Sequence, residues 1–175
     1  MPRRSDPETQ LARIVADYAD RGVVALEEAQ EAHAPAAAWL DLLIDQVAEP
    51  EVGVVTSWLL RVYLADGIEL TAAQVGALCR ALPRVEEPMA SLHVCQSVGD
   101  LTVPNRCREP LARFLREGVE SSHKFVRAWA VDGLYRLGRK HAEYREEAAR
   151  VLDVASRDAA ASVRARVRQI AREKR

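Results

Sequence analysis

A short motif recurs along the chain at nearly constant spacing. It occurs as Val55-Thr-Ser-Trp58, Val126-Arg-Ala-Trp129 and Val163-Arg-Ala-Arg166, and Met89-Ala-Ser-Leu92 is a weaker copy. The first positions of these copies are 34, 37 and 37 residues apart. This distance is the length of two short helices and their turns, so the chain is expected to fold as successive helical hairpins.

The apolar pattern also predicts helices. Apolar residues recur every three or four positions, which places them on one helical face. The first such stripe comprises Leu11, Ile14, Val15 and Tyr18. Glycines and prolines separate the stretches, and helices are expected to end near Gly22, to span 23–33, and to begin at Pro35. Thr71 and Gln74 have the spacing of a capping box. Only 5% of the residues are aromatic, which disfavours an all-β fold.

The two C-terminal copies resemble the HEAT repeat, whose second helix begins with a Val-Arg pair and continues with small and leucine residues. Val126-Arg127 and Val163-Arg164 supply that pair, and Asp158 lies five residues before Val163, as in many HEAT units. The resemblance extends over about 106–173. Over 39–98 it consists of spacing and apolar pattern, because the copies there lack the arginine.

This resemblance implies an all-α fold, an α-solenoid of about four HEAT-like hairpins with an N-terminal helical cap. The whole of 1–175 is then one domain. The expected cap is about 7–33, and the expected repeats are about 35–66, 71–99, 106–138 and 140–174. Each unit would bury its apolar face only against its neighbours. The second helices would line the concave surface.

Two columns on the second helices form a candidate binding groove. Positions five and nine after each repeat start lie opposite the side expected to face the core. Read along the array, the columns are Leu60, Val94, Val131, Arg168 and Leu64, Val98, Tyr135, Arg172. With Arg164 they would form an apolar groove that ends in an arginine cluster. Such a groove suits a protein or peptide partner with an acidic end, which predicts a non-enzymatic binding or scaffold module.

Burial is the alternative interpretation of these columns. A closely stacked or strongly curved array, or an N-terminal helix folded across the groove, would bury Leu60, Leu64, Val94 and Val98 as ordinary core, since a helix that is apolar all round is usually buried. The arginines would then be a solvated surface.

The charge distribution separates the two halves of the chain. Residues 1–100 contain 7 Lys+Arg and 16 Asp+Glu, a net charge of 7 − 16 = −9, and residues 101–175 contain 18 and 10, a net charge of 18 − 10 = +8. This asymmetry has three possible explanations: charge that is merely solvated, steering of an anionic partner, or head-to-tail self-association. The near-neutral total disfavours a general nucleic-acid coat.

No recognised catalytic motif or cofactor fingerprint is present. The four histidines have no recognisable spacing and lie on different expected elements: His33, His93, His123 and His141. The cysteines and His93 match no common zinc module, so neither metal nor cofactor is expected.

One enzymatic alternative comes from HEAT-like alkylpurine DNA glycosylases, whose basic concave surface carries tryptophan and aspartate. Trp129 and Asp132 are three residues apart on one expected helix, with Arg127 nearby. A carboxylate beside an aromatic ring could stabilise a cationic sugar while arginines hold phosphates. A packing tryptophan beside a solvated aspartate is the competing interpretation.

The expected location is the cytoplasm. The longest uncharged apolar stretch, 52–60, is too short to span a bilayer, and no apolar run of a secretory signal follows the basic N-terminus. Three cysteines, Cys79, Cys95 and Cys107, are typical of small core residues in a reducing compartment.

Overall fold

The computed structural model describes residues 6–32 and 35–173, and within these ranges every regular element is helical. The prediction of an all-α fold is confirmed. The helices are α1 (Pro7–Arg21), α2 (Val23–Ala32), α3 (Ala37–Asp45), α4 (Gly53–Ala65), α5 (Ala72–Ala81), α6 (Pro88–Ser97), α7 (Asn105–Val119), α8 (Lys124–Lys140), α9 (Arg145–Ala155) and α10 (Ala161–Glu173). Short 3₁₀ turns lie at Leu82–Arg84, Val98–Asp100 and Ala142–Tyr144. His33 and Lys174, expected near the ends of the cap and the last repeat, lie outside the described residues.

Local signals in the sequence fix several helix ends. α1 begins where the Asp6 carboxylate accepts hydrogen bonds from the backbone N–H groups two and three residues later, both at 3.1 Å. It ends at Gly22, whose φ of 63° suits glycine. The capping box at α5 is confirmed, since Thr71 Oγ1 accepts from the Gln74 N–H at 3.2 Å and Gln74 Oε1 accepts from the Thr71 N–H at 2.9 Å. α3 begins two residues after Pro35, not at it, because the intervening residue is extended.

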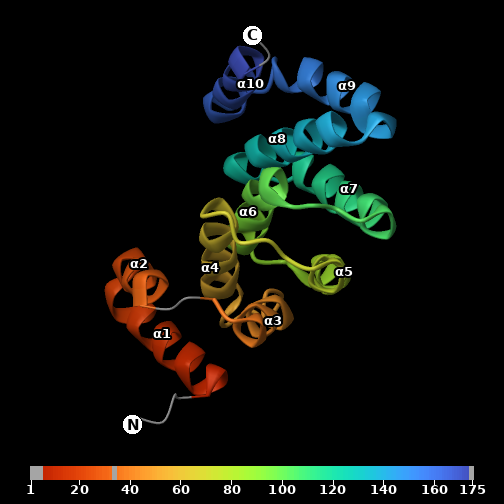
Figure 1. Ribbon diagram of the computed structural model, residues 1–175. Coiled ribbons are helices and arrows are strands. Elements are labelled where there is room, and N and C mark those ends of the chain that lie inside the picture. Colours follow the sequence, from red (N-terminus) through yellow and green to blue (C-terminus); the bar gives the residue numbers. More distant parts are fainter. Residues whose placement is uncertain (1–5, 33–34, 174–175) are drawn as a thin grey trace.

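The helices follow an arc in two rows (Figure 1). α4, α6, α8 and α10 form the inner row, in which each helix contacts the next, and α3, α5, α7 and α9 form the outer row. α1 and α2 pack on each other at the N-terminal end, where they contact α3 and α4. Adjacent helices in sequence therefore alternate between the two rows.

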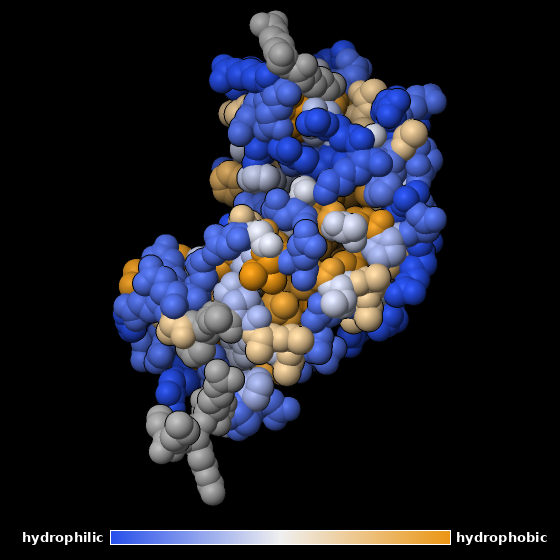
Figure 2. All heavy atoms as spheres, viewed as in Figure 1, coloured by the Kyte–Doolittle hydropathy of each residue, from blue (hydrophilic) through white to orange (hydrophobic). Residues whose placement is uncertain are grey.

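The apolar core extends through most of this arc. One cluster of buried side chains runs from Leu11 in α1 to Tyr144 beyond α8, and a smaller cluster joins α8 to α9 and α10. At the α7–α8 contact a Cβ on Gly133 would lie 2.6 Å from Leu115 Cδ2, so the absence of a side chain permits this close approach. Figure 2 shows apolar surface over the middle of the arc and largely hydrophilic surface at the α9–α10 end. Among the described helices, none combines the length and the apolar character needed to cross a bilayer.

The register of the second copy differs from the sequence-based expectation by one residue. The third residue of each inner helix is buried, and these residues are Val55, Ala90, Val126 and Val163. Met89, expected at this position, is 39% exposed. The expectation was wrong because both an apolar Met89 and a small Ala90 fit a repeat start, and only packing against the neighbouring helices distinguishes them. The corrected spacings are 35, 36 and 37 residues.

Candidate binding surface

The apolar members of the two predicted columns lie inside the protein. All six are buried, with 1% to 5% of each residue exposed: Leu60, Leu64, Val94, Val98, Val131 and Tyr135. These side chains therefore form no open apolar groove, and the alternative interpretation, burial as core, describes their positions.

Close packing along the inner row explains this burial. α4 contacts α6, α6 contacts α8, and α8 contacts α10, so the side of an inner helix opposite the core faces a neighbouring helix instead of solvent. Val131, for example, packs in the small cluster with Ala155 and Val163. Val94 and Val98 are core for a second reason: from Ala90 they are positions four and eight, not five and nine.

The arginines at the ends of the columns are more exposed than the apolar members. Arg168 and Arg172 are exposed on α10, and Arg164 is partly buried. Arg168 and Arg172 occupy the positions at which α8 carries the buried Val131 and Tyr135. The apolar stacking surface therefore does not continue on α10.

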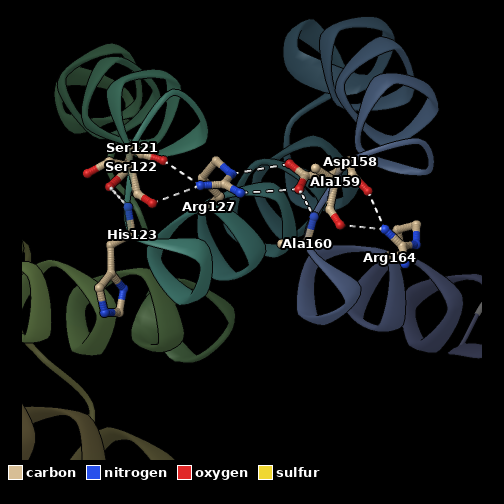
Figure 3. A network of polar contacts seen from close by, with 8 residues as sticks. All are labelled: Ser121, Ser122, His123, Arg127, Asp158, Ala159, Ala160 and Arg164. Carbon is tan, nitrogen blue, oxygen red and sulfur yellow. Dashed lines mark hydrogen bonds and ion pairs between the residues drawn. The ribbon is translucent and has the colours of Figure 1, made fainter.

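Arg127 and Arg164 bind the turns that precede their helices (Figure 3). Arg127 Nη1 donates to the carbonyls of Ser121 and Ser122 at 2.8 and 3.1 Å, while its Nε and Nη2 bind the Asp158 carboxylate at 3.1 and 3.2 Å. Arg164 Nη1 donates in the same way to the carbonyls of Asp158 and of the next residue, at 2.5 and 2.8 Å. The hydrogen bonds from Arg127 are the main reason that the pKa of Asp158 lies below its ordinary value. Two successive hairpins are thus linked by charge-assisted hydrogen bonds.

This placement removes Arg127 from the predicted Trp129–Asp132 site. The guanidinium of Arg127 donates its hydrogen bonds to two carbonyls of one turn and to the Asp158 carboxylate. Asp132 instead forms ion pairs with Arg136 and Arg166. The physical reason is helical geometry, because Arg127 and Trp129 are two positions apart and point to different sides of α8.

Trp129 and Asp132 do lie together, in an inner-face cluster with Arg136, Arg166 and Glu173. The Arg166 guanidinium carbon is 3.3 Å from the Trp129 ring centroid, a cation–π contact. Asp132 is 3% exposed, and its Oδ2 binds Arg136 Nε at 3.1 Å. Arg136 Nη2 also reaches Glu173 at 2.8 Å. Two aligned helices, α8 and α10, therefore supply every member of the cluster.

Hydrogen bonding in the inner-face cluster is incomplete. Arg166 Nη1 and Asp132 Oδ1 are 3.9 Å apart, too far for a hydrogen bond, and Asp132 Oδ1 has no hydrogen-bond partner among the described residues. Burial is the main cause that lowers the pKa of Arg166, and the charge of Asp132 opposes that effect. The site thus holds one acceptor and a guanidinium with unused hydrogen-bonding capacity.

Sequence reasoning missed Arg136, Arg166 and Glu173. A signal for two of them was present, because Arg136 is one helical turn after Asp132, and Arg166 has the same place in its repeat as Trp129. The pairing of Glu173 with Arg136 depends on how α10 lies against α8, which the sequence alone does not state.

A second polar group lies between α4 and α6. Ser57 Oγ is 3.0 Å from His93 Nδ1 and donates to the Val54 carbonyl at 3.1 Å. The Arg61 guanidinium lies 5.4 Å from the ring centroid of Trp58. Burial, and secondly the charge of Arg61, lowers the pKa of His93 to about 4. Ser57 and His93 are 2% and 6% exposed, so this pair joins two inner helices.

The cysteines are buried, and burial raises the pKa of Cys79 and of Cys95 to about 12. Within residues 6–32 and 35–173, no group of three or more His, Cys, Asp or Glu side chains is placed to hold a metal ion.

Comparisons with protein family models, curated proteins and solved structures give no match.

Proposed function

We propose that this protein is a non-enzymatic binding module, an α-solenoid of HEAT-like hairpins whose inner row of helices contacts a protein or peptide partner. The alternation of inner and outer helices supports the solenoid, as do the equivalent positions of Arg127 and Arg164. Each of these arginines binds carbonyls of the turn before its own helix, which is the behaviour of a repeated unit.

The contact surface in this proposal is the inner-face cluster, in which the side chains of Arg136 and Glu173 are 28% and 31% exposed and that of Arg166 is 11% exposed. The observation that carries it is Arg166, whose guanidinium stacks on Trp129 and lies too far from Asp132 for a hydrogen bond. A stacked guanidinium is held in place and can bind a carboxylate with two parallel hydrogen bonds. Tryptophan and arginine are also the residues that most often dominate protein interfaces. An acidic segment of a partner fits this surface.

The test compares partners recovered from native cell extract by the wild type and by Arg166→Glu, with Arg113→Glu as the matched control. Arg113 is exposed on the outer helix α7, so the control makes the same charge change away from the inner face. A protein recovered by the wild type and the control but lost with Arg166→Glu, when the circular dichroism of that variant matches the wild type, supports the proposal. Equal recovery by all three folded proteins rejects this surface as the contact.

A HEAT-like DNA glycosylase is the second candidate, favoured by the adjacency of Trp129 to the incompletely bonded carboxylate of Asp132. It predicts release of methylated purine from duplex DNA and loss of that release in Asp132→Asn. It also predicts DNA binding that weakens steeply with salt. If the protein neither binds duplex DNA at low salt nor releases base, the glycosylase activity is excluded. The binding module is then the remaining proposal.

A further inference from the structure

A groove opens between the outer helices α7 and α9. Its volume is about 780 Å³, and its apolar lining includes Val119, Val151 and Val154. The equivalent space one repeat earlier, between α7 and the segment after α5, is only about 240 Å³. Leu82 and Phe114 line that smaller space, whereas Val119 and Val151 line the later one. The smaller valines leave the later site open.

The rim of this groove is exposed, apolar and basic. Val154 is 68% exposed, the largest value among the exposed large hydrophobic side chains of the described residues. Arg150 and Arg157 flank it, each in an ion pair with an acidic residue four positions earlier. Both pairs are solvent-exposed, and such pairs are weak enough to exchange for a partner's carboxylate.

The opposite end of the molecule carries a complementary face on α2. Val23 and Val24 are 49% and 53% exposed. Glu27, Glu28 and Glu31 are also exposed and follow them at helical spacing, so the two valines and three glutamates form one stripe. Glu28 binds Arg21, again in an exposed pair. This α2 stripe is apolar at its start and acidic along the rest.

We propose that these two surfaces bind each other between copies of this chain, with the α2 stripe of one copy in the α7–α9 groove of the next. The apolar pair would cover Val151 and Val154, and the glutamates would meet Arg150 and Arg157. The net charges of −9 for residues 1–100 and +8 for residues 101–175 add a long-range attraction in the same orientation.

The contact is intermolecular and head-to-tail. α2 and α9 lie at opposite ends of the arc, so a chain does not fill its own groove (Figure 1). The two surfaces differ, and a contact between unlike surfaces leaves each complex with one free stripe and one free groove. Further copies can therefore add at both ends, which gives an open filament, or a closed ring where the rotation between copies closes.

The test is sedimentation velocity of the full chain over a range of concentrations at low and high salt. The wild type is expected to grow beyond the monomer mass of 19.4 kDa as concentration rises, and to dissociate at high salt. The groove variant Val154→Glu and the stripe variant Val23→Glu with Val24→Glu should each stay monomeric. These three valines are exposed, so the helical circular dichroism of both variants should match the wild type. Phe125→Glu, which changes another exposed apolar side chain outside both surfaces, should assemble as the wild type does.

Mixing the two variants gives the decisive result. The groove variant retains its stripe and the stripe variant retains its groove, so together they should form a one-to-one dimer that grows no further. A monomeric wild type at all concentrations overturns the proposal. So do assembly that survives either variant, and a mixture that stays monomeric.

Discussion

The buried His93 should make the protein lose stability as the pH falls below 7. Its pKa is about 4 in the folded chain, against an ordinary value of 6.5, because burial and Arg61 disfavour the charged imidazole. Below pH 6.5 the unfolded chain binds a proton at this residue that the folded chain does not. Stability from neutral His93 is therefore fully present above about pH 6.5 and is lost as the pH falls towards 4.

The magnitude follows from these two pKa values. Between pH 7 and pH 5, this one residue should lower the free energy of unfolding by about 2 kcal/mol. The control variant is His93→Leu, which cannot titrate and leaves the hydrogen bond from Ser57 to the Val54 carbonyl in place. Other groups, such as His141, titrate equally in both proteins, so their contributions cancel.

The measurement is urea unfolding of both proteins at pH 7 and pH 5, followed by circular dichroism. The wild type should lose about 2 kcal/mol more than His93→Leu over this interval. Equal losses in the two proteins would show that the folded chain protonates His93 as readily as the unfolded chain does, and the reasoning from burial would fail.

Two further predictions concern packing and the turns. Arg127→Ala should lower the free energy of unfolding by about 1–3 kcal/mol, because it removes the donor to two turn carbonyls and two of the hydrogen bonds to the Asp158 carboxylate, which keeps the one from the Ala160 N–H at 2.6 Å. Arg113→Ala, on exposed surface, should change it by less than about 0.5 kcal/mol. Chemical unfolding measures both, and equal effects would refute the role of the turn contacts. Gly53→Ala should cost about 1–3 kcal/mol, because its Cβ would lie 2.7 Å from the Val47 carbonyl oxygen. Gly76→Ala would place its Cβ 3.2 Å from Arg106 Nη2 and 3.5 Å from Arg80 Nη1, the ends of two long side chains, so it should cost less than Gly53→Ala. Thermal melts that rank these two variants in the opposite order would contradict the packing described.

The helices were predictable from the sequence because their signals are local. The capping box at Thr71 and the glycine at 22 act on residues within one helical turn, and both have the predicted effect. The Val-Arg pairs also located the start of α8 and α10 closely. The error at Met89 arose where the local signal was ambiguous, since two adjacent residues each fit the pattern.

The candidate site was less predictable because it depends on contacts between helices. Helical periodicity identifies opposite sides of α8, but it does not say that α10 covers the side carrying Val131. The adjacency of Trp129 and Asp132 is local and was foreseen. The positions of Arg166 and Glu173 over that pair depend on the alignment of α10 with α8, which follows from packing across the whole interface.

α8 is the central helix of this arrangement, since it contacts the two preceding helices, α6 and α7, and the two following helices, α9 and α10. A defect in α1 or α10 can fray one end while the remaining hairpins keep most of their neighbours. A substitution that disrupts the middle of α8 affects both neighbours at once, because α9 and α10 pack on the rest of the molecule mainly through α8. It would therefore separate the acidic half of the molecule from most of the basic half. Substitutions that are harmless at either terminus should therefore be least tolerated at the buried positions in the middle of this helix.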